Sequence, residues 1–198
     1  MVTDDVDNVL ILAKLKVNNI VSGSRASDRD VIARYTAIFS NNFINWLLFA
    51  FKLAKSQTAK DNLSENISCE LKGDHPGMLR NFAISANSFP FPADFEYTAK
   101  VVMDVSNSQF RYGWLYAVVL LALLENTSLV FIPDLQVRAI RLGGTDMSYT
   151  TAHGEADVQH AMELKDAVIS EVLQDDTNLE IQQAVDSLVD IIKCIYYS

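Results

Sequence analysis

The chain contains only three histidines, and two of them belong to the pattern His153-x-x-x-Asp157-x-x-His160. On a helix, steps of four and seven residues return to nearly the same face, so two imidazoles and one carboxylate would project together. Mixed histidine and carboxylate ligands suit iron or manganese better than a thiolate-rich site would. The same stripe is also compatible with the solvated polar face of an amphipathic helix, so the motif alone leaves both interpretations open.

A fourth candidate ligand, Glu125, ends the most hydrophobic stretch of the chain, which runs from Gly113 to Leu124. Burying a carboxylate at the end of such a helix is costly unless a partner compensates for the lost hydration. Glu125 is therefore either a helix-end residue that reaches solvent or a metal ligand inside a helical bundle, where carboxylates and histidines from facing helices converge.

The remaining histidine, His75, lies five residues after Glu70. Five residues do not return to one face of a helix, so the Gly73-Asp74 turn would have to aim His75. A turn histidine beside a proline is the simpler interpretation. If both residues are ligands, three histidines and three carboxylates divide into two metal positions, and Glu65, about one turn and a half before Glu70, is the fallback ligand.

Two further motifs resemble the second core helix of the heme-oxygenase-like fold, namely Leu63-x-x-Asn66-x-x-x-Glu70 and Gly73-x-His75-Pro76-x-x-Leu79-x-x-Phe82. Glu125 and the His153-x-x-x-Asp157-x-x-His160 segment resemble the rest of the metal-binding subgroup of that fold. This subgroup is the heme-oxygenase-like diiron oxidases and oxygenases. The resemblance covers roughly residues 30 to 170, with the ordered set of ligand types as its specific part.

The resemblance implies an all-α fold, a seven-helix heme-oxygenase-like bundle, which we expect to be a single domain over residues 1–198. It also implies two Fe(II)/Fe(III) ions as cofactors and O₂ as co-substrate. The implied metal ligands are Glu70, His75, Glu125, His153, Asp157 and His160. Tyr149, one turn before His153, would be a catalytic residue, although a tyrosine that only forms the cavity wall is an equally good interpretation.

The function implied by the resemblance is the O₂-dependent oxidation of a small metabolite in a biosynthetic pathway. The reactions of the subgroup include N-oxygenation, C–C cleavage, desaturation and nitrile formation, and an amino acid or a related small carboxylate is the expected substrate. An external electron donor is compatible with this chemistry. The alternative is a metal-free or mononuclear protein of the same fold with a binding or interaction role.

The sequence departs from the pattern of the subgroup on the first core helix. Several members carry a further glutamate there, whereas the stretch from Tyr35 to Trp46 contains no carboxylate, which implies a weakly held second iron. Two other activities of the fold fit less well. Heme oxygenases use an early histidine, but none precedes His75, and a thiamin-salvage hydrolase needs a later cysteine, but the chain has only Cys69 and Cys194.

Residues that would bind a substrate are harder to identify. Three arginines lie on or beside the predicted core helices and could clamp a carboxylate: Arg111, Arg138 and Arg141. A surface position is the simpler interpretation for each of them. Phe110, Tyr112 and Trp114 could line an aromatic pocket, but aromatic residues on a buried helix usually belong to the core.

Composition excludes several classes of protein. Hydrophobic residues make up 49% of the chain, while 7 Gly and 4 Pro are few for an all-β protein rich in turns. The net charge of −9 disfavours nucleic acid and anionic membrane surfaces as partners. The acidic N-terminus does not resemble a signal peptide, and the two cysteines are too few for a disulfide framework, so we expect a cytoplasmic protein.

The spacing of apolar residues by three and four predicts helices along most of the chain. The expected helices are 6–21, 28–56 after a Ser27 N-cap, 61–71, 76–86, 93–104, 108–126, 133–142, 146–174 and 179–197. Residues 128–132 are too short to assign by periodicity. Gly143-Gly144 is typical of a helix C-terminus. The last segment could be a lid, a packing helix or a dimer surface, and a homodimer is compatible with it.

Overall fold

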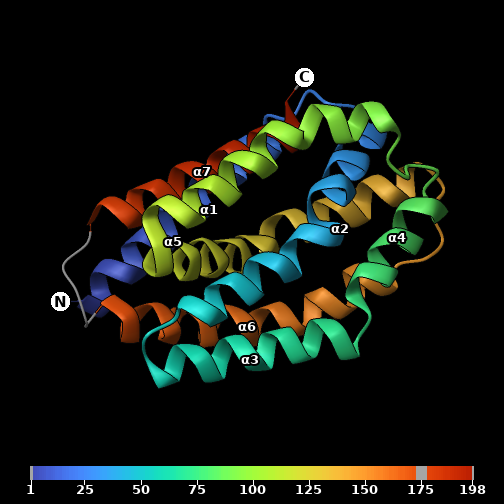
Figure 1. The fold of residues 1–198 in the computed structure, drawn as a ribbon. Helices are drawn as coiled ribbons and strands as arrows, with labels where there is room; N and C mark the ends of the chain where they lie inside the picture. Colours follow the sequence, from blue (N-terminus) through green and yellow to red (C-terminus); the bar gives the residue numbers. More distant parts are fainter. Residues whose placement is uncertain (1, 173–177, 198) are drawn as a thin grey trace.

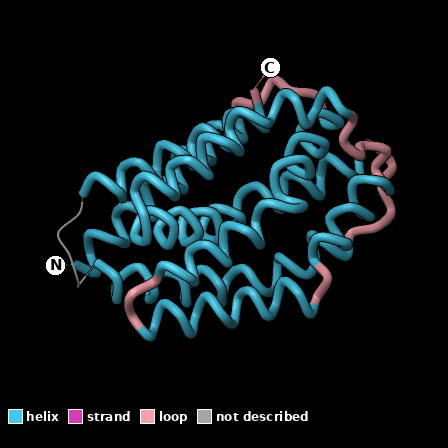
Figure 2. Tube along the Cα trace, viewed as in Figure 1, coloured by secondary structure: helices cyan, strands magenta, loops and turns pink. Residues whose placement is uncertain are grey.

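The computed structural model describes residues 2–172 and 178–197, and every regular element in those ranges is an α-helix (Figures 1 and 2). The helices are α1 (Val2–Ser22), α2 (Asp28–Leu53), α3 (Gln57–Lys72), α4 (His75–Ser85), α5 (Pro92–Arg141), α6 (Ser148–Val172) and α7 (Asn178–Tyr196). The all-α class and the helical bundle expected from the sequence are therefore confirmed.

Capping hydrogen bonds and a first-turn proline explain where several helices begin. The side chain of Ser27 accepts a hydrogen bond from the Asp30 amide and caps α2, as predicted. Ser56 caps α3 in the same way. At α5, Pro92 occupies the first turn, and the Phe91 amide donates to the Asp94 carboxylate over 2.7 Å.

Helix α5 differs most from the sequence-based expectation, which had three separate helices between residues 93 and 142. Residues 128–132 are helical, and Pro133 lies inside the helix rather than at its start. Ile132 and Leu135 on either side of Pro133 are almost completely buried, so packing offsets the hydrogen bond that the proline removes. The real break is Gly113, whose φ of 74° and ψ of −146° divide α5 into two segments.

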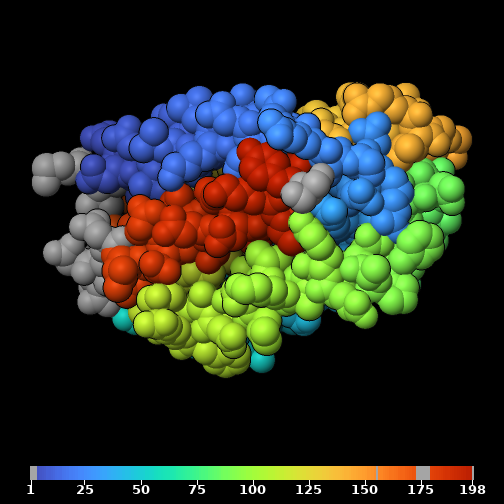
Figure 3. Space-filling view, turned by 90° about the horizontal axis from the view of Figure 1, so that it is seen from above, coloured from blue at the N-terminus to red at the C-terminus, as the bar shows by residue number. Residues whose placement is uncertain are grey.

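The second segment of α5 runs through the middle of the bundle, where α2, α6 and α7 all pack against the helix (Figure 1). By length and composition α5 could cross a membrane, but 83% of its most apolar window is buried inside the protein, as in a core helix. In Figure 3, α7 lies between α1 and the first segment of α5. Its apolar side chains Leu188, Ile191, Ile192 and Ile195 are fully buried, so α7 is a packing helix.

The end of α5 agrees with the sequence-based prediction, whereas the start of α6 differs from it. Gly143 follows α5 with a φ of 81°, which confirms the predicted C-terminal glycine. Helix α6 begins at Ser148, two residues later than predicted, because the Asp146 carboxylate accepts from the Ser148 amide ahead of the helix. The predicted end of this helix at Gln174 lies outside the described residues.

Candidate metal centre

The corner between α3 and α4 brings Glu70 and His75 together. Helix α3 ends at Lys72, and Asp74 adopts a left-handed conformation (φ 50°) as the N-cap of α4, which begins at His75. His75 Nδ1 then lies 2.9 Å from Glu70 Oε1, and both side chains are buried. The predicted aiming of His75 by this turn is confirmed. Glu65 is exposed and does not join the cluster.

Glu125 enters the cluster from the second segment of α5 and is only 3% exposed. Asn66, one turn before Glu70 on α3, donates a hydrogen bond from Nδ2 to Glu125 Oε1 over 3.1 Å. Glu125 therefore does not reach solvent, and this α3–α5 contact fixes the orientation of its carboxylate.

Helix α6 supplies the other three side chains from one face, as the spacing predicted. His153, Asp157 and His160 are each at most 6% exposed. His153 Nδ1 lies 2.8 Å from Asp157 Oδ1, one turn further along the helix. His160 Nδ1 lies 3.8 Å from Glu125 Oε1, too far for a hydrogen bond.

All six sequence-predicted ligand residues gather in this buried region, where they form two groups of three. One group is Glu70, His75 and His153, and the other is Glu125, Asp157 and His160. Within each group the potential ligand atoms lie within 4.8 Å of one another. The His153–Asp157 hydrogen bond joins the two groups, and the His75 and His153 rings lie with their centroids 4.7 Å apart and their planes tilted by 56°.

The cluster perturbs the ionisation of its own members. Burial, reinforced by the nearby Asp157 carboxylate, raises the pKa of Glu125 to about 8. Burial alone would lower the pKa of His153, but the hydrogen bond to Asp157 and the surrounding carboxylates raise it above its ordinary value. Burial lowers the pKa of His160. Opposite shifts within one cluster are typical of functional sites.

The donor atoms of the cluster fit a bound cation. Three buried atoms, His153 Nε2, Asp157 Oδ2 and His160 Nδ1, have no hydrogen-bond partner. Buried polar atoms are normally satisfied, and metal ions in the two groups would accept electron pairs from these atoms. Because the donors are imidazole nitrogens and carboxylate oxygens without a thiolate, they suit iron or manganese.

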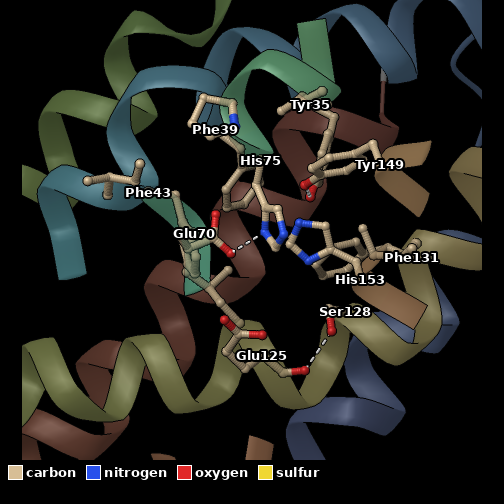
Figure 4. A pocket seen from close by; sticks show the side chains of 15 residues that line it. Tyr35, Phe39, Phe43, Glu70, His75, Glu125, Ser128, Phe131, Tyr149 and His153 are labelled. Atoms are coloured by element: carbon tan, nitrogen blue, oxygen red, sulfur yellow. Dashed lines mark hydrogen bonds and ion pairs between the residues drawn. The ribbon is translucent and has the colours of Figure 1, made fainter. Parts of the chain in front are cut away.

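A pocket of about 480 Å³, including the part open to solvent, lies against the cluster and is lined by residues of α2, α3, α4, α5 and α6. Glu70, His75, Glu125 and His153 form its polar floor, and Figure 4 shows them converging on one region. Tyr149 lines the pocket and is buried, with its ring centroid 4.4 Å from that of His153.

Tyr35 of α2 is a pocket residue that the sequence did not reveal. Its hydroxyl lies 2.7 Å from that of Tyr149, and the two groups meet beside the histidines (Figure 4). Burial raises the pKa of both tyrosines well above their ordinary value, so each keeps its proton. The sequence showed Asn66 only as a motif residue one turn before Glu70 and did not reveal its hydrogen bond to Glu125.

The arginines proposed as carboxylate clamps do not line the pocket. Arg138 is buried and pairs with Asp28 and Asp134, while Arg141 pairs with Asp28. Arg111 is exposed and stacks over Tyr112. None of Phe110, Tyr112 and Trp114 lines the pocket, and Phe110 is 78% exposed.

The fold and the cluster define an all-α protein with a buried histidine and carboxylate centre beside a pocket. A family model described as "iron-containing redox enzyme" matches residues 32–191, which is most of the chain. The protein therefore belongs to this family of iron-containing redox enzymes, and its heme-oxygenase-like fold agrees with the resemblance seen in the sequence. No curated protein matches the chain significantly.

Proposed function

We propose that this protein is a non-heme diiron enzyme that uses O₂ to oxidise a small carboxylate in a biosynthetic reaction. The observation that carries the proposal is the division of six buried ligand-type residues into two groups of three, on a chain that belongs to an iron-containing redox family. Glu70, His75 and His153 would hold one iron, and Glu125, Asp157 and His160 would hold the other. When bound, the two irons supply the electrons and the Lewis acidity needed to activate O₂.

The side chains around the centre have three separate tasks. Asn66 orients Glu125, and the His153–Asp157 hydrogen bond fixes the direction of the His153 ring. The apolar pocket walls exclude water from the reaction. Tyr149 and Tyr35 keep their protons, so one hydroxyl of the pair can donate a hydrogen bond to a substrate oxygen while accepting from the other.

The two irons are expected to bind with different affinities. Glu70, His75 and His153 offer two imidazoles, whereas Glu125, Asp157 and His160 offer only one. Helix α2 contributes Tyr35, Phe39 and Phe43 to the pocket but no carboxylate that could strengthen either group. The one-histidine group is the better candidate for the weakly held iron.

The test is an anaerobic Fe(II) titration of the metal-free protein, followed by mixing with O₂ and stopped-flow absorbance. We expect about two irons per chain, bound in two steps, and a transient visible absorption after mixing. His153→Ala and Glu125→Ala each remove a ligand from a different group and should each lose at least one iron.

Glu65→Ala is the matched control, because Glu65 lies on α3 near Glu70 but is exposed. It should bind iron like the parent protein. Binding of one iron would favour a mononuclear centre, and the absence of binding would favour a metal-free binding protein; either result contradicts the diiron proposal. Equal loss of iron in Glu65→Ala would show that the predicted ligand set is wrong.

A further inference from the structure

The pocket beside the cluster is almost free of charged side chains. Apart from Glu70, His75, Glu125 and His153, its described lining consists of apolar side chains and three hydroxyls. The apolar lining residues are Phe39, Phe43, Ile44, Pro76, Leu79, Leu124, Phe131 and Ile132. No lysine or arginine in the described part of the chain lines the pocket. Only the cluster itself could therefore bind the charged group of a ligand.

The three hydroxyls are neutral and partly engaged with the protein, so they offer an ammonium group no negative charge. Tyr35 and Tyr149 are hydrogen-bonded to each other, and Ser128 donates to the main-chain oxygen of Glu125 over 2.6 Å. An ammonium group in the pocket would therefore face aromatic and aliphatic walls, with no free carboxylate other than the cluster residues. Transferring an ammonium group from water to such surroundings is costly.

The sign of the charge at the cluster depends on the metals. Three carboxylates contribute about −3, and two divalent irons on the proposed function contribute about +4, which leaves a loaded centre with a net charge near +1. In a pocket with apolar walls, this charge attracts an anionic head group and repels an ammonium group, because the low polarity strengthens both interactions.

We propose that the substrate has an apolar body, a single anionic head group directed at the cluster, and no ammonium group. This inference rests on the proposed function and narrows it, because it excludes the zwitterionic amino acids that the family resemblance implied. The apolar body would lie between α2 and α5 against Phe39 and Phe131, whose rings are stacked 6.5 Å apart.

The pocket opens where its lining is least buried, at Phe43, Ile44 and Pro76. A larger side chain at Ile44 should therefore obstruct ligand entry without touching the predicted metal ligands. Leu48, one turn further along α2, is 38% exposed and does not line the pocket, so it offers a matched position for the same substitution.

The experiment measures anaerobic calorimetric binding of three probes with a common phenylethyl skeleton to the Fe(II)-loaded protein. The probes are 3-phenylpropanoate, L-phenylalanine and 2-phenylethylammonium. We expect 3-phenylpropanoate to bind at least tenfold more tightly than L-phenylalanine, and 2-phenylethylammonium not to bind. Ile44→Trp should weaken binding of 3-phenylpropanoate at least tenfold, whereas Leu48→Trp should leave it unchanged.

Iron content is measured in the same samples, so failure of metal loading is distinguishable from failure of ligand recognition. If both irons are bound but L-phenylalanine binds as tightly as 3-phenylpropanoate, the ammonium group is accepted and the inference is wrong. It is also wrong if a fully loaded protein binds none of the probes, or if Ile44→Trp and Leu48→Trp behave alike.

Discussion

At the scale of single residues, Glu125 shows how burial turns an ordinary carboxylate into a poised ligand. Burial and the Asp157 carboxylate raise the pKa of Glu125 to about 8, whereas the hydrogen bond from Asn66 opposes that rise. A metal ligand must be deprotonated, so a metal ion that binds Glu125 at neutral pH has to displace a proton. The affinity for metal should therefore increase as the pH rises towards 8.

Asn66→Ala tests this coupling. Without its hydrogen bond the pKa of Glu125 rises further, and the carboxylate also loses its orientation. We expect the affinity of the weaker iron site to fall roughly 10- to 100-fold, as for other partners of metal ligands. The loss should be larger at about pH 6.5 than at about pH 8.5, because the parent Glu125 is mostly ionised at the higher pH. Anaerobic Fe(II) titration of the parent protein and the variant at both pH values measures this loss of affinity.

Asn62→Ala provides the control for this substitution. Asn62 lies one turn earlier on α3 and donates to the main-chain oxygen of Glu163, away from the cluster. It should leave the titration unchanged at both pH values. A loss in Asn66→Ala that does not depend on pH would contradict the role assigned to the Glu125 pKa.

At the scale of elements, the corner between α3 and α4 determines whether His75 can face Glu70. Asp74 holds this corner through a left-handed backbone conformation and a hydrogen bond in which its carboxylate accepts from the Gly77 amide over 3.3 Å. Aspartate and asparagine tolerate this conformation better than alanine does.

Asp74→Ala should therefore cost about 2 kcal/mol of unfolding free energy, from the lost helix cap and the strained backbone together. It should also reduce occupancy of the iron site formed by Glu70, His75 and His153, because the direction of His75 depends on the turn. Urea unfolding and iron analysis measure the two effects.

Asp74→Asn keeps both the cap and the left-handed preference, so it should retain most of the stability and the iron. If the asparagine variant were as damaged as the alanine variant, the negative charge of Asp74 rather than the geometry of the turn would be responsible.

At the scale of the whole molecule, ion pairs join the beginning of α2 to the end of α5. Asp28 accepts from Arg138 over 3.0 Å and from two nitrogens of Arg141 over 2.8 Å. The hydrogen bond from Arg141, with further contributions from Arg138, outweighs partial burial and lowers the pKa of Asp28 below its ordinary value of 3.8. These arginines stabilise the fold instead of binding substrate.

A carboxylate with a lowered pKa in the folded state stabilises the protein above its unfolded pKa, and that stabilisation is lost as the pH falls through the folded pKa. Asp28→Asn should therefore destabilise the protein at pH 7 by about 1 kcal/mol, because the pair is partly solvent-exposed. The difference from the parent protein should shrink below about pH 3.8.

Urea unfolding at pH 7 and at about pH 3 measures this difference. Asp30→Asn is the control, because Asp30 lies in the same first turn of α2 and its carboxylate pairs with the neighbouring Arg29, over 3.3 Å, instead of with α5. A constant difference between Asp28→Asn and the parent protein at both pH values would contradict the role of the ion pair.

Much of the fold and of the candidate site could be predicted from the sequence, because the relevant signals are local. Helical periodicity and the Ser27 cap depend on residues within a few positions of one another. The spacing of His153, Asp157 and His160 places them on one face of any helix that contains them. The scarcity of histidines also made the six candidate ligands easy to single out.

The tertiary structure decided what depends on distant partners. Pro133 lies inside α5 because buried neighbours on other helices offset its missing hydrogen bond, which no local pattern reveals. Asn66 reaches Glu125 across 59 positions, and Tyr35 reaches Tyr149 across 114. The pocket, which has no lysine or arginine in its described lining, likewise exists only once α2 to α6 pack together, because helix packing determines which side chains share one cavity.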